Sequence, residues 1–378
     1  MAVLRATHCA EELGGFVFLR DPKQTAAERA AMAAHCSKFE NHQSKIAEGW
    51  LCVATGGTSG GTKFARHDER TLLAAVEGLR AHFGLQRINA VDVLPPHHVS
   101  GLMARVRAAA TGGEHRPWGW KRLEAGDFPR LDTRGDGWVI SLVPTQVQRL
   151  LQVPAAVAWL RGFRAVFVGG GPVWPELAAA AEAAALPVAL SYGMTETAAM
   201  VAALRPEEFL AGGRSCGRAL PHAQLTIGAD GVVRVAGESV FRGYWPEERE
   251  EREFVTEDLG RLDASGRLHV LGRRDAIIIT GGKKVQPAEV EAALRASGEF
   301  AEVAVFGVLD AEWGELVVAC FPAGGEREPD TMRAAAALAA HQRPKRFLAI
   351  SEWPRNAQGK VNRADLRAVA VAMLAGRG

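Results

Sequence analysis

The stretch AVFVGGGPVWPELAAAAEAAALPVALSYGMTET, residues 165–197, decides the fold of this 378-residue chain. It begins with a short apolar run that ends in three glycines, continues through an alanine-rich helical segment, and closes with a second apolar run. Strand, helix and strand in this order predict a βαβ unit, in which the two strands lie parallel. Ligands bind at the carboxyl ends of such strands, so the glycines at 169–171 and the polar segment at 191–197 are candidates for one site.

The alternation of strands and helices begins well before this unit. The segments between short apolar runs carry helical periodicity, and Thr145 stands where it could cap one of these helices. We expect strands at 50–54, 90–94 and 138–143, and helices at 70–83, 99–110, 145–151 and 154–162. This order predicts an α/β fold with a mostly parallel sheet.

The pattern of apolar and polar residues changes after about residue 212. Alternating runs at 223–245 and 260–273 are split by Asp-Gly and Ser-Gly turns, which predicts antiparallel hairpins in a β-rich subdomain. The elements expected beyond Arg273 are strands at 276–282 and 301–308 and helices at 287–297 and 331–342. We therefore expect a large N-terminal domain, 1–274, and a small mobile α+β domain, 275–378.

The composition excludes several classes of protein. Hydrophobic residues make up 48% of the chain and charged residues 23%, and the formal net charge is only +2. The scattered Lys and Arg residues give no reason to expect a nucleic acid partner. The five cysteines contain no C-x-x-C pair, so neither a zinc site nor a disulfide framework is predicted. The sequence shows neither a signal-peptide pattern nor an apolar run of membrane length, and we expect a reducing cytoplasm as the location.

The stretch TGGTSGGTK, residues 55–63, places four glycines and several hydroxyl groups between two apolar runs. Its spacing begins like the phosphate loop G-x-x-x-x-G-K-[ST], with Gly56 and Gly61 in the glycine positions. Thr62 and Lys63 then stand in the wrong order, and no Ser or Thr follows the lysine to bind magnesium. A Walker loop is therefore not predicted, and the stretch by itself reads equally well as a glycine turn between two strands.

Five stretches of the chain occur in the order that is typical of adenylate-forming enzymes. They are TGGTSGGTK at 55–63, SYGMTET at 191–197, TEDLGRL at 256–262, GRRDAIIITGGKKVQPAEVE at 272–291 and PRNAQGKVNR at 354–363. Over residues 50–365 the chain therefore resembles the acyl-CoA synthetase superfamily. This resemblance implies an enzyme that makes an acyl adenylate from ATP and a carboxylic acid, with Mg²⁺ as cofactor, and then forms a CoA thioester.

Adenylate formation brings a carboxylate to the α-phosphate of ATP, so the site must spread negative charge over N–H groups, hydroxyls, a lysine and Mg²⁺. The resemblance implies that the glycine loop holds the β- and γ-phosphates and that residues 192–196 meet adenine, the α-phosphate and Mg²⁺. The implied ATP-binding residues are Thr58, Ser59, Gly60, Lys63, Gly170, Gly171, Tyr192, Gly193, Met194, Thr195, Asp258 and Arg273. The implied catalytic residues are Lys360, Thr195 and Glu196, and Glu196 is also the implied magnesium ligand.

Residues nearer the C-terminus carry further implied roles. Asp258 takes the ribose hydroxyls, with Arg273 on the ribose side, and Lys360 reaches the reacting carboxylate and phosphate. Asp275 falls on the hinge of the family. The residues that resemble its pantetheine tunnel, and so bind CoA, are Gly281, Gly282 and Lys283. Each of these roles has an alternative reading. Glu196 reads also as a glutamate favoured at a helix start, Asp258 and Arg273 as a surface ion pair, and Lys360 as a solvent-exposed lysine.

Segments that resemble the o-succinylbenzoate–CoA ligases of menaquinone and phylloquinone biosynthesis are HVSG at 98–101, FARH at 64–67 and LVPTQVQRLL at 142–151. The implied acid-binding residues are His98, Ser100, Arg105 (or Arg107) and Gly193, with the arginine meeting the distal charge of a dicarboxylate. A histidine at a helix start is often a capping or packing group, so this second reading of His98 stays open.

Three positions depart from the pattern of the family. Thr62 stands where proline is usual, and Phe64 and Glu257 stand where glycine is usual. Two other functions are therefore kept open: another aryl or acyl adenylating enzyme, which could pass its acyl group to a carrier protein, and a non-catalytic nucleotide-binding protein. The expected partners are a small-molecule acid, ATP and CoA, and a homodimer is left open.

Overall fold

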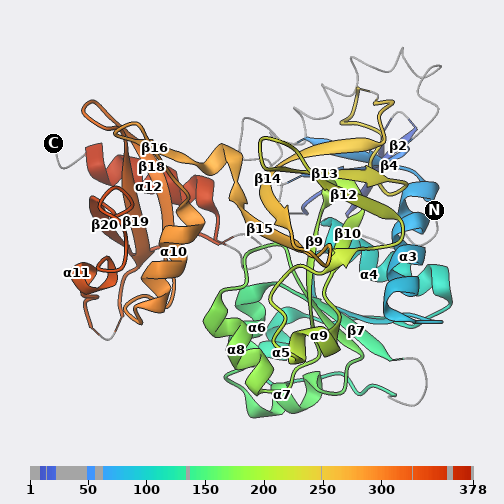
Figure 1. Ribbon diagram of the computed structural model, residues 1–378. Helices are drawn as coiled ribbons and strands as arrows, with labels where there is room; N and C mark the ends of the chain where they lie inside the picture. The colour runs from blue at the N-terminus through green and yellow to red at the C-terminus, as the bar shows by residue number, and fades with distance from the viewer. Residues whose placement is uncertain are drawn as a thin grey trace. The chain divides into compact units, whose positions relative to one another are not determined.

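The computed structural model describes residues 9–13, 15–22, 49–55, 63–132, 137–247, 249–325, 327–355 and 361–375. Its contacts divide the chain into two compact units (Figure 1). Unit 1 comprises Met1–Gly228, Arg234–Thr256 and Leu262–His269, and unit 2 comprises Ala229–Val233, Glu257–Arg261 and Val270–Gly378. The predicted division between residues 274 and 275 stays a proposal.

A seven-stranded sheet forms the centre of unit 1, with the strand order β11-β10-β9-β8-β7-β5-β6. Its strands are β5 (Asn89–Asp92), β6 (His115–Pro117), β7 (Trp138–Leu142), β8 (Ala165–Val168), β9 (Val188–Met194), β10 (Ala199–Ala203) and β11 (Arg218–Ala219). Strands β6, β5, β7, β8 and β9 run parallel, whereas β10 lies antiparallel to β9 and β11. The predicted βαβ unit at 165–197 is therefore confirmed.

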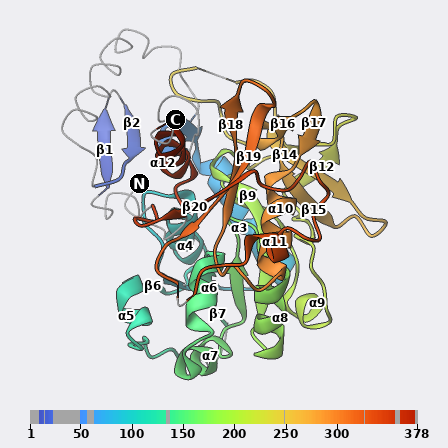
Figure 2. The same cartoon turned by 90° about the vertical axis from the view of Figure 1, so that its left-hand side faces the viewer.

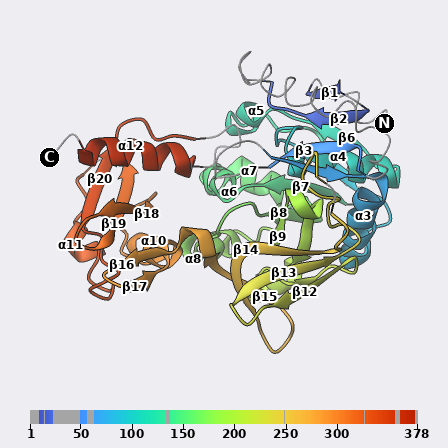
Figure 3. The same cartoon turned by 90° about the horizontal axis from the view of Figure 1, so that it is seen from above.

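Helices cover both faces of this sheet. They are α3 (Glu69–Phe83), α4 (Val99–Thr111), α5 (Trp120–Glu124), α6 (Pro144–Leu150), α7 (Pro154–Leu160), α8 (Pro175–Ala183) and α9 (Pro206–Leu210). One core packs α3 and α4 against Ala165 and Phe167, and another packs α6 to α8 against Val166 and Val168. Successive residues of β8 thus face opposite layers. Figure 3 shows α3 and α4 on one side of β7 to β9 and α6 to α8 on the other.

The start of α6 differs from the sequence prediction. The helix begins at Pro144, Val143 occupies the N-cap position, and Thr145 lies within the first turn. Proline is suited to the first helical position because its φ angle is already helical and its nitrogen needs no partner there. Thr145 is therefore not the cap.

A separate four-stranded sheet carries the predicted glycine loop. Its order is β1 (Ala10–Leu13), β2 (Phe16–Leu19), β3 (Leu51–Ala54) and β4 (Phe64–His67). In the sequence the loop falls between β3 and β4, which pair antiparallel, so neither of its flanking strands belongs to the parallel sheet. The strand at Phe64–His67 is not evident from the sequence because Arg66 and His67, although polar, are completely buried.

A third sheet has the order β12-β13-β14-β15. Its strands are β12 (Ala223–Ile227), β13 (Val232–Gly237), β14 (Glu253–Leu262) and β15 (Leu268–Arg273). The turns at Asp230–Gly231 and Ser265–Gly266 join neighbouring strands, as the Asp-Gly and Ser-Gly pairs predict. Both glycines have positive φ, at 78° and 73°, which glycine adopts without steric cost.

Unit 2 contains a five-stranded sheet between helices. Its elements are η3 (Arg274–Ala276), β16 (Ile278–Thr280), β17 (Lys283–Val285), α10 (Pro287–Ala296), β18 (Ala304–Asp310), β19 (Gly314–Pro322), α11 (Thr331–Ala334), β20 (Arg346–Ile350) and α12 (Arg363–Ala375). Separate cores pack α10 and α11 on one face and α12 on the other, as Figure 2 shows. The helix predicted at 331–342 is wrong beyond Ala334, where the chain continues as turns around the buried Leu338.

The helices of the described residues are short: the longest, α3, spans 15 residues, and α4 and α12 span 13 each. In that part of the chain no helix combines the length and the apolar character needed to cross a membrane.

Candidate active site

The segment 191–197 continues from the last parallel strand into a single helical turn. Strand β9 ends at Met194, and η2 covers Thr195–Thr197. The buried Thr197 hydroxyl lies 3.1 Å from the Met194 nitrogen and 2.7 Å from the Ala199 carbonyl oxygen. The Glu196 carbonyl accepts a hydrogen bond from the Phe241 N–H at 2.9 Å. These contacts hold the turn on both sides of the predicted catalytic residues Thr195 and Glu196.

The backbone around this turn is unusual. A Cβ atom on Gly193 would lie 1.9 Å from the Ala199 carbonyl oxygen, so only glycine fits between β9 and β10 here. Ala198 and Ala199 both have positive φ, at 51° and 75°. Alanine pays a steric cost in this region, and such strained residues cluster at functional sites. The turn is therefore a candidate functional element on geometric grounds as well.

His67, at the end of β4, supports the same turn. Its Nε2 lies 2.7 Å from the Thr195 carbonyl oxygen and its Nδ1 lies 3.1 Å from the Thr71 hydroxyl. Burial lowers the pKa of His67 to about 4, so the imidazole is neutral at neutral pH. Because a carbonyl oxygen can only accept, the proton must reside on Nε2. The sequence predicts no individual role for this residue.

Tyr244 joins two of the predicted site residues. Its hydroxyl donates a hydrogen bond to Glu196 Oε1 at 2.7 Å, and the Lys63 Nζ lies 5.2 Å from the centre of its ring. Burial, followed by the Glu196 carboxylate, raises the pKa of this phenol well above its ordinary value, so the hydroxyl stays protonated. Sequence reasoning missed Tyr244 because the stretch FRGYW reads as the end of a hairpin.

Strand pairing brings Tyr244 to this position across a long sequence separation. Ala65 forms a β-bridge with Tyr244, and the Trp245 N–H donates to the Phe64 carbonyl at 2.8 Å. Arg242 and Asp68 form a buried ion pair at 2.8 Å beside this bridge. The segment 241–245 therefore acts as an additional edge to β4.

The glycines that follow β8 lie beside the same strand β9. A Cβ atom on Gly169 would lie 2.6 Å from Ser191 Oγ, and the Ser191 hydroxyl donates to the Val168 carbonyl at 3.2 Å. Gly170 has a φ of 72°. Unit 1 thus brings together the predicted residues Lys63, Thr195 and Glu196, and places Gly169, which directly precedes Gly170 and Gly171, next to the strand that carries Tyr192.

Four predicted residues lie outside the described part of the chain. They are Thr58, Ser59, Gly60 and Lys360. At the base of the glycine loop, the Thr55 N–H donates to the Lys63 carbonyl at 2.9 Å, which closes the hairpin. At the base of the segment that contains Lys360, Arg355 and Val361 form a β-bridge. The roles of these four residues stay predictions.

The predicted acid-binding residues lie on or before α4. His98 occupies the N-cap position of this helix but makes no side-chain capping hydrogen bond, so the capping reading is wrong. Ser100 and Arg105 are partly exposed. Arg107, in contrast, is 3% exposed and lies 5.8 Å from the centre of the Phe167 ring, within the core. Of the two arginines considered, Arg105 therefore remains as the candidate for a substrate charge.

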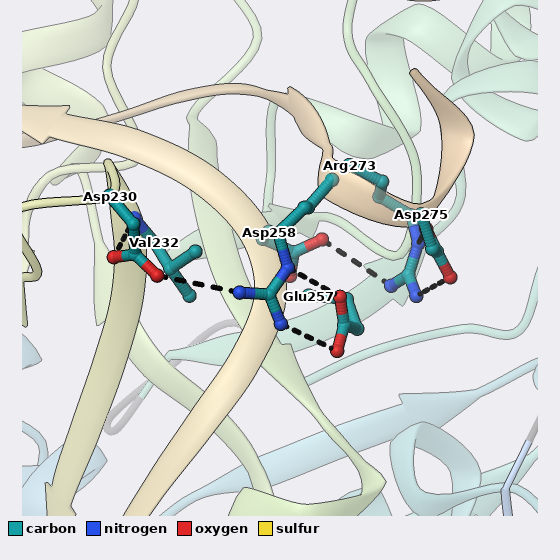
Figure 4. Close-up of polar contacts among 7 residues, drawn as sticks. Asp230, Val232, Glu257, Asp258, Arg273 and Asp275 are labelled. Atoms are coloured by element: carbon teal, nitrogen blue, oxygen red, sulfur yellow. Dashed lines mark hydrogen bonds and ion pairs between the residues drawn. The ribbon is translucent and has the colours of Figure 1, made fainter. Parts of the chain in front are cut away.

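Unit 2 contains the predicted ribose and hinge residues, shown in Figure 4. Arg273 donates two hydrogen bonds to Asp275, at 2.9 and 2.7 Å, and a longer one to Asp258 at 3.4 Å. Arg274 makes a bidentate pair with Glu257 at 3.0 and 2.9 Å and also reaches Asp230. Neighbouring residues of a strand point to opposite faces, so Glu257 does not crowd the face that carries Asp258.

The predicted CoA-binding glycines form a tight hairpin in unit 2. Gly281 and Gly282 join β16 to β17 with φ angles of 53° and 74°, which a two-residue turn of this kind requires. The Gly281 N–H donates to the Trp313 carbonyl at 2.9 Å. Lys283 is exposed on β17.

The donor set suits magnesium that arrives with a nucleotide. Among the described residues, no three His, Cys, Asp or Glu side chains gather into a metal site. Glu196 offers a single carboxylate, and Mg²⁺ is usually held by one or two carboxylates with phosphate oxygens and water. Glu196 therefore fits as the protein ligand of a magnesium–triphosphate complex.

Comparison with known proteins agrees with this class of site. Residues 16–245 match the family described as AMP-binding enzyme, and residues 289–360 match the AMP-binding enzyme C-terminal domain. The chain belongs to the AMP-binding enzyme family.

Individual relatives narrow the comparison. The chain is 31% identical over 325 residues to the 2-succinylbenzoate–CoA ligase of Enterococcus faecalis, covering 81% of this chain and 67% of that protein. The solved o-succinylbenzoate CoA synthetase of Bacillus subtilis, in complex with its acyl-adenylate intermediate, is 27% identical with a TM-score of 0.73. That alignment covers 85% of this chain and 70% of the other. The same synthetase solved with ATP and a magnesium ion has a TM-score of 0.69 at 26% identity, with the same two coverages. The predicted family and fold class are therefore confirmed.

Proposed function

We propose that this chain is an AMP-forming acid–CoA ligase, which converts a carboxylic acid and ATP to an acyl adenylate and then to a CoA thioester. This proposal rests on the turn that contains Thr195 and Glu196, which lies at the carboxyl end of a parallel strand. Tyr244 contacts both Glu196 and Lys63 and so joins this turn to the lysine. Parallel α/β sheets bind ligands at that edge.

The residues of unit 1 provide the charge that the first step needs. Lys63 and the hydroxyl-rich loop before it hold the β- and γ-phosphates, and Thr195 contacts the α-phosphate. Glu196 holds magnesium, which when bound supplies positive charge to the phosphate oxygens. Tyr192, Gly193 and Met194 line the nucleotide. With this arrangement the attack of one anion on another loses much of its electrostatic cost.

Unit 2 supplies the remaining groups. Asp258 accepts hydrogen bonds from the ribose hydroxyls, with Arg273 on the ribose side, and Lys360 contacts the reacting carboxylate and phosphate. In this mechanism the small domain 275–378 turns about Asp275 between the two steps, withdrawing Lys360 and presenting Gly281, Gly282 and Lys283 to CoA. Domain rearrangements of this sort assemble a catalytic site only for the step that needs it.

We propose o-succinylbenzoate as the acid, which places the enzyme in menaquinone biosynthesis. The named activity of the similar ligases supports this choice. His98, Ser100, Arg105 and Gly193 border the acid, and the half-exposed Arg105 is available for the second carboxylate of a dicarboxylic acid. A cytoplasmic location and a homodimer complete the proposal.

The test is a panel of acids assayed with ATP, Mg²⁺ and CoA. We expect o-succinylbenzoate to give AMP, pyrophosphate and a thioester that appears only when CoA is present. If benzoates or fatty acids are converted but o-succinylbenzoate is not, the proposed acid is wrong and the proposed class of enzyme stands. Adenylation without CoA transfer would indicate a carrier-dependent enzyme, and the absence of pyrophosphate with every acid would indicate a non-catalytic nucleotide-binding protein.

A further inference from the structure

Tyr244 has no assigned role, and it contacts two groups of the proposed site. We propose that Tyr244 is a positioning residue for the magnesium–triphosphate complex, orienting the Glu196 carboxylate with its hydroxyl and the Lys63 ammonium with its ring. This inference rests on the proposed function of Glu196 and Lys63, whereas the assignment of Tyr244 comes from its own contacts.

The first contact selects one orientation of the carboxylate. Glu196 is half-buried, and its side chain would otherwise rotate about three bonds. The 2.7 Å hydrogen bond from the Tyr244 hydroxyl engages Oε1, which leaves Oε2 as the oxygen that meets a cation. A hydrogen bond to a charged group contributes more than one between neutral groups. The hydroxyl thereby reduces the rotational freedom that metal binding would have to remove.

The second contact places a positive charge on the same aromatic ring. The Lys63 ammonium lies 5.2 Å from the ring centre, within the range of a cation–π interaction. Lys63 is exposed and immediately precedes β4, so the ring restricts a side chain that solvent would leave free to rotate. The anionic carboxylate and the ammonium are thus held by opposite parts of one side chain.

The position of Tyr244 is itself well defined. Its backbone bridges to Ala65, and hydrogen bonds on either side join Gly243 to Arg66 and Trp245 to Phe64. The Phe241 ring packs edge-on at 4.8 Å. Because these supports involve the backbone and the ring, removing the hydroxyl alone should leave them intact.

The experiment measures binding of the Mg²⁺ complex of a non-hydrolysable ATP analogue by titration calorimetry, without acid or CoA. Tyr244→Phe should bind the magnesium complex about tenfold more weakly, the loss expected for one hydrogen bond to a charged group. Its binding of the analogue in EDTA should equal that of the wild type. Tyr244→Leu, which also removes the ring, should weaken binding in EDTA as well. Phe254→Leu is the matched control, because Phe254 packs edge-on against Phe241 as Tyr244 does but has no hydroxyl to donate to Glu196.

A double-mutant cycle with Glu196→Gln identifies the route of the effect. If Tyr244 acts through Glu196, the loss caused by Tyr244→Phe should nearly vanish in the Glu196→Gln background. Equal losses in both backgrounds, or a Tyr244→Phe variant with wild-type magnesium dependence, would overturn the inference. If the wild type binds no magnesium–nucleotide complex, the proposed function itself fails, which is a separate result.

Discussion

The two units hold their polar groups in different ways. In unit 1 the turn at Thr195 is held by hydrogen bonds from the neutral His67 and from backbone N–H groups, all at buried or half-buried positions. In unit 2 the residues around Asp258 are joined by exposed ion pairs of Arg273 and Arg274. Exposed pairs contribute little and exchange partners readily, whereas buried hydrogen bonds to a backbone persist.

This difference matches the tasks proposed for the two units. A phosphate site requires donors that are already in place when charge develops. A hinge requires contacts that break at low cost. Unit 2 nevertheless has buried pairs as well, among them that of Glu291, on α10, which accepts hydrogen bonds from the Val305 N–H at 2.7 Å and from Arg363 at 2.8 Å. That group lies in the core that the hinge would move as a body.

Lys360 tests whether unit 2 contributes to the chemistry at all, and it has the largest expected effect. Loss of a single donor to a developing charge costs about 10²–10³-fold in rate, or about 3–4 kcal/mol. Lys360→Ala should therefore nearly abolish pyrophosphate release but leave the conversion of pre-made acyl adenylate and CoA close to wild type. Both half-reactions are followed by product chromatography. Equal damage to both would contradict the proposed movement of the small domain between the two steps.

Glu291 tests whether buried pairs in unit 2 behave like those of a rigid core. Glu291→Ala leaves Arg363 and the Val305 N–H without their acceptor. We expect a loss of about 3 kcal/mol in unfolding free energy, at the low end for buried pairs because Arg363 retains 45% exposure of its side chain. Urea denaturation measures it, with Glu315→Ala, which removes an exposed hydrogen bond from the Ile279 N–H, as control. If Glu291→Ala loses no more unfolding free energy than the control, the buried pair of Glu291 contributes no more to stability than an exposed hydrogen bond.

The pH dependence of stability tests whether a neutral His67 imidazole supports the turn at Thr195 in unit 1. Its pKa is lowered from 6.5 to about 4, mainly by burial, with Asp68 and Arg242 as charged neighbours. The unfolded chain therefore binds the proton first, and stability should fall as the pH drops from about 6.5 towards 4 and stay level above 6.5. His67→Gln removes this contribution, about 2–3 kcal/mol by pH 4.

The measurement is the urea midpoint of wild type and His67→Gln at pH 7.5 and pH 4.5. His222 remains in both proteins with a pKa also lowered to about 4, chiefly by burial, so part of the acid loss should persist in the variant. An identical acid loss in the two proteins would mean that His67 is not the neutral donor described for the Thr195 carbonyl.

Arg274 should have the smallest effect. Arg274→Ala removes the exposed bidentate pair with Glu257, and we expect a thermal midpoint unchanged within the error of measurement at 0.15 M salt. A clear loss that disappears at high salt would show that this pair restrains unit 2 and would weaken the contrast between the units.

Sequence alone was sufficient for the main sheet and for its class of site. The βαβ unit at 165–197 is a local pattern, because strand and helix periodicities and the glycines after β8 are properties of neighbouring residues. The order of five short motifs predicted the family that the comparisons confirmed. Where prediction failed locally, as at Thr145, an adjacent proline gave the alternative start of the helix.

The tertiary structure decided which side chains support that site. Arg66 and His67 read as surface residues, yet pairing of β4 with both β3 and the segment 241–245 buries them. Tyr244 reaches Glu196 only because chain segments about 180 residues from β4 become its edge. Periodicity describes the environment of a residue along its own element, whereas a contact between distant segments depends on how complete elements pack. The sequence by itself therefore determined the sheet and the class of chemistry, and the packing of distant strands determined how His67 and Tyr244 hold the catalytic turn.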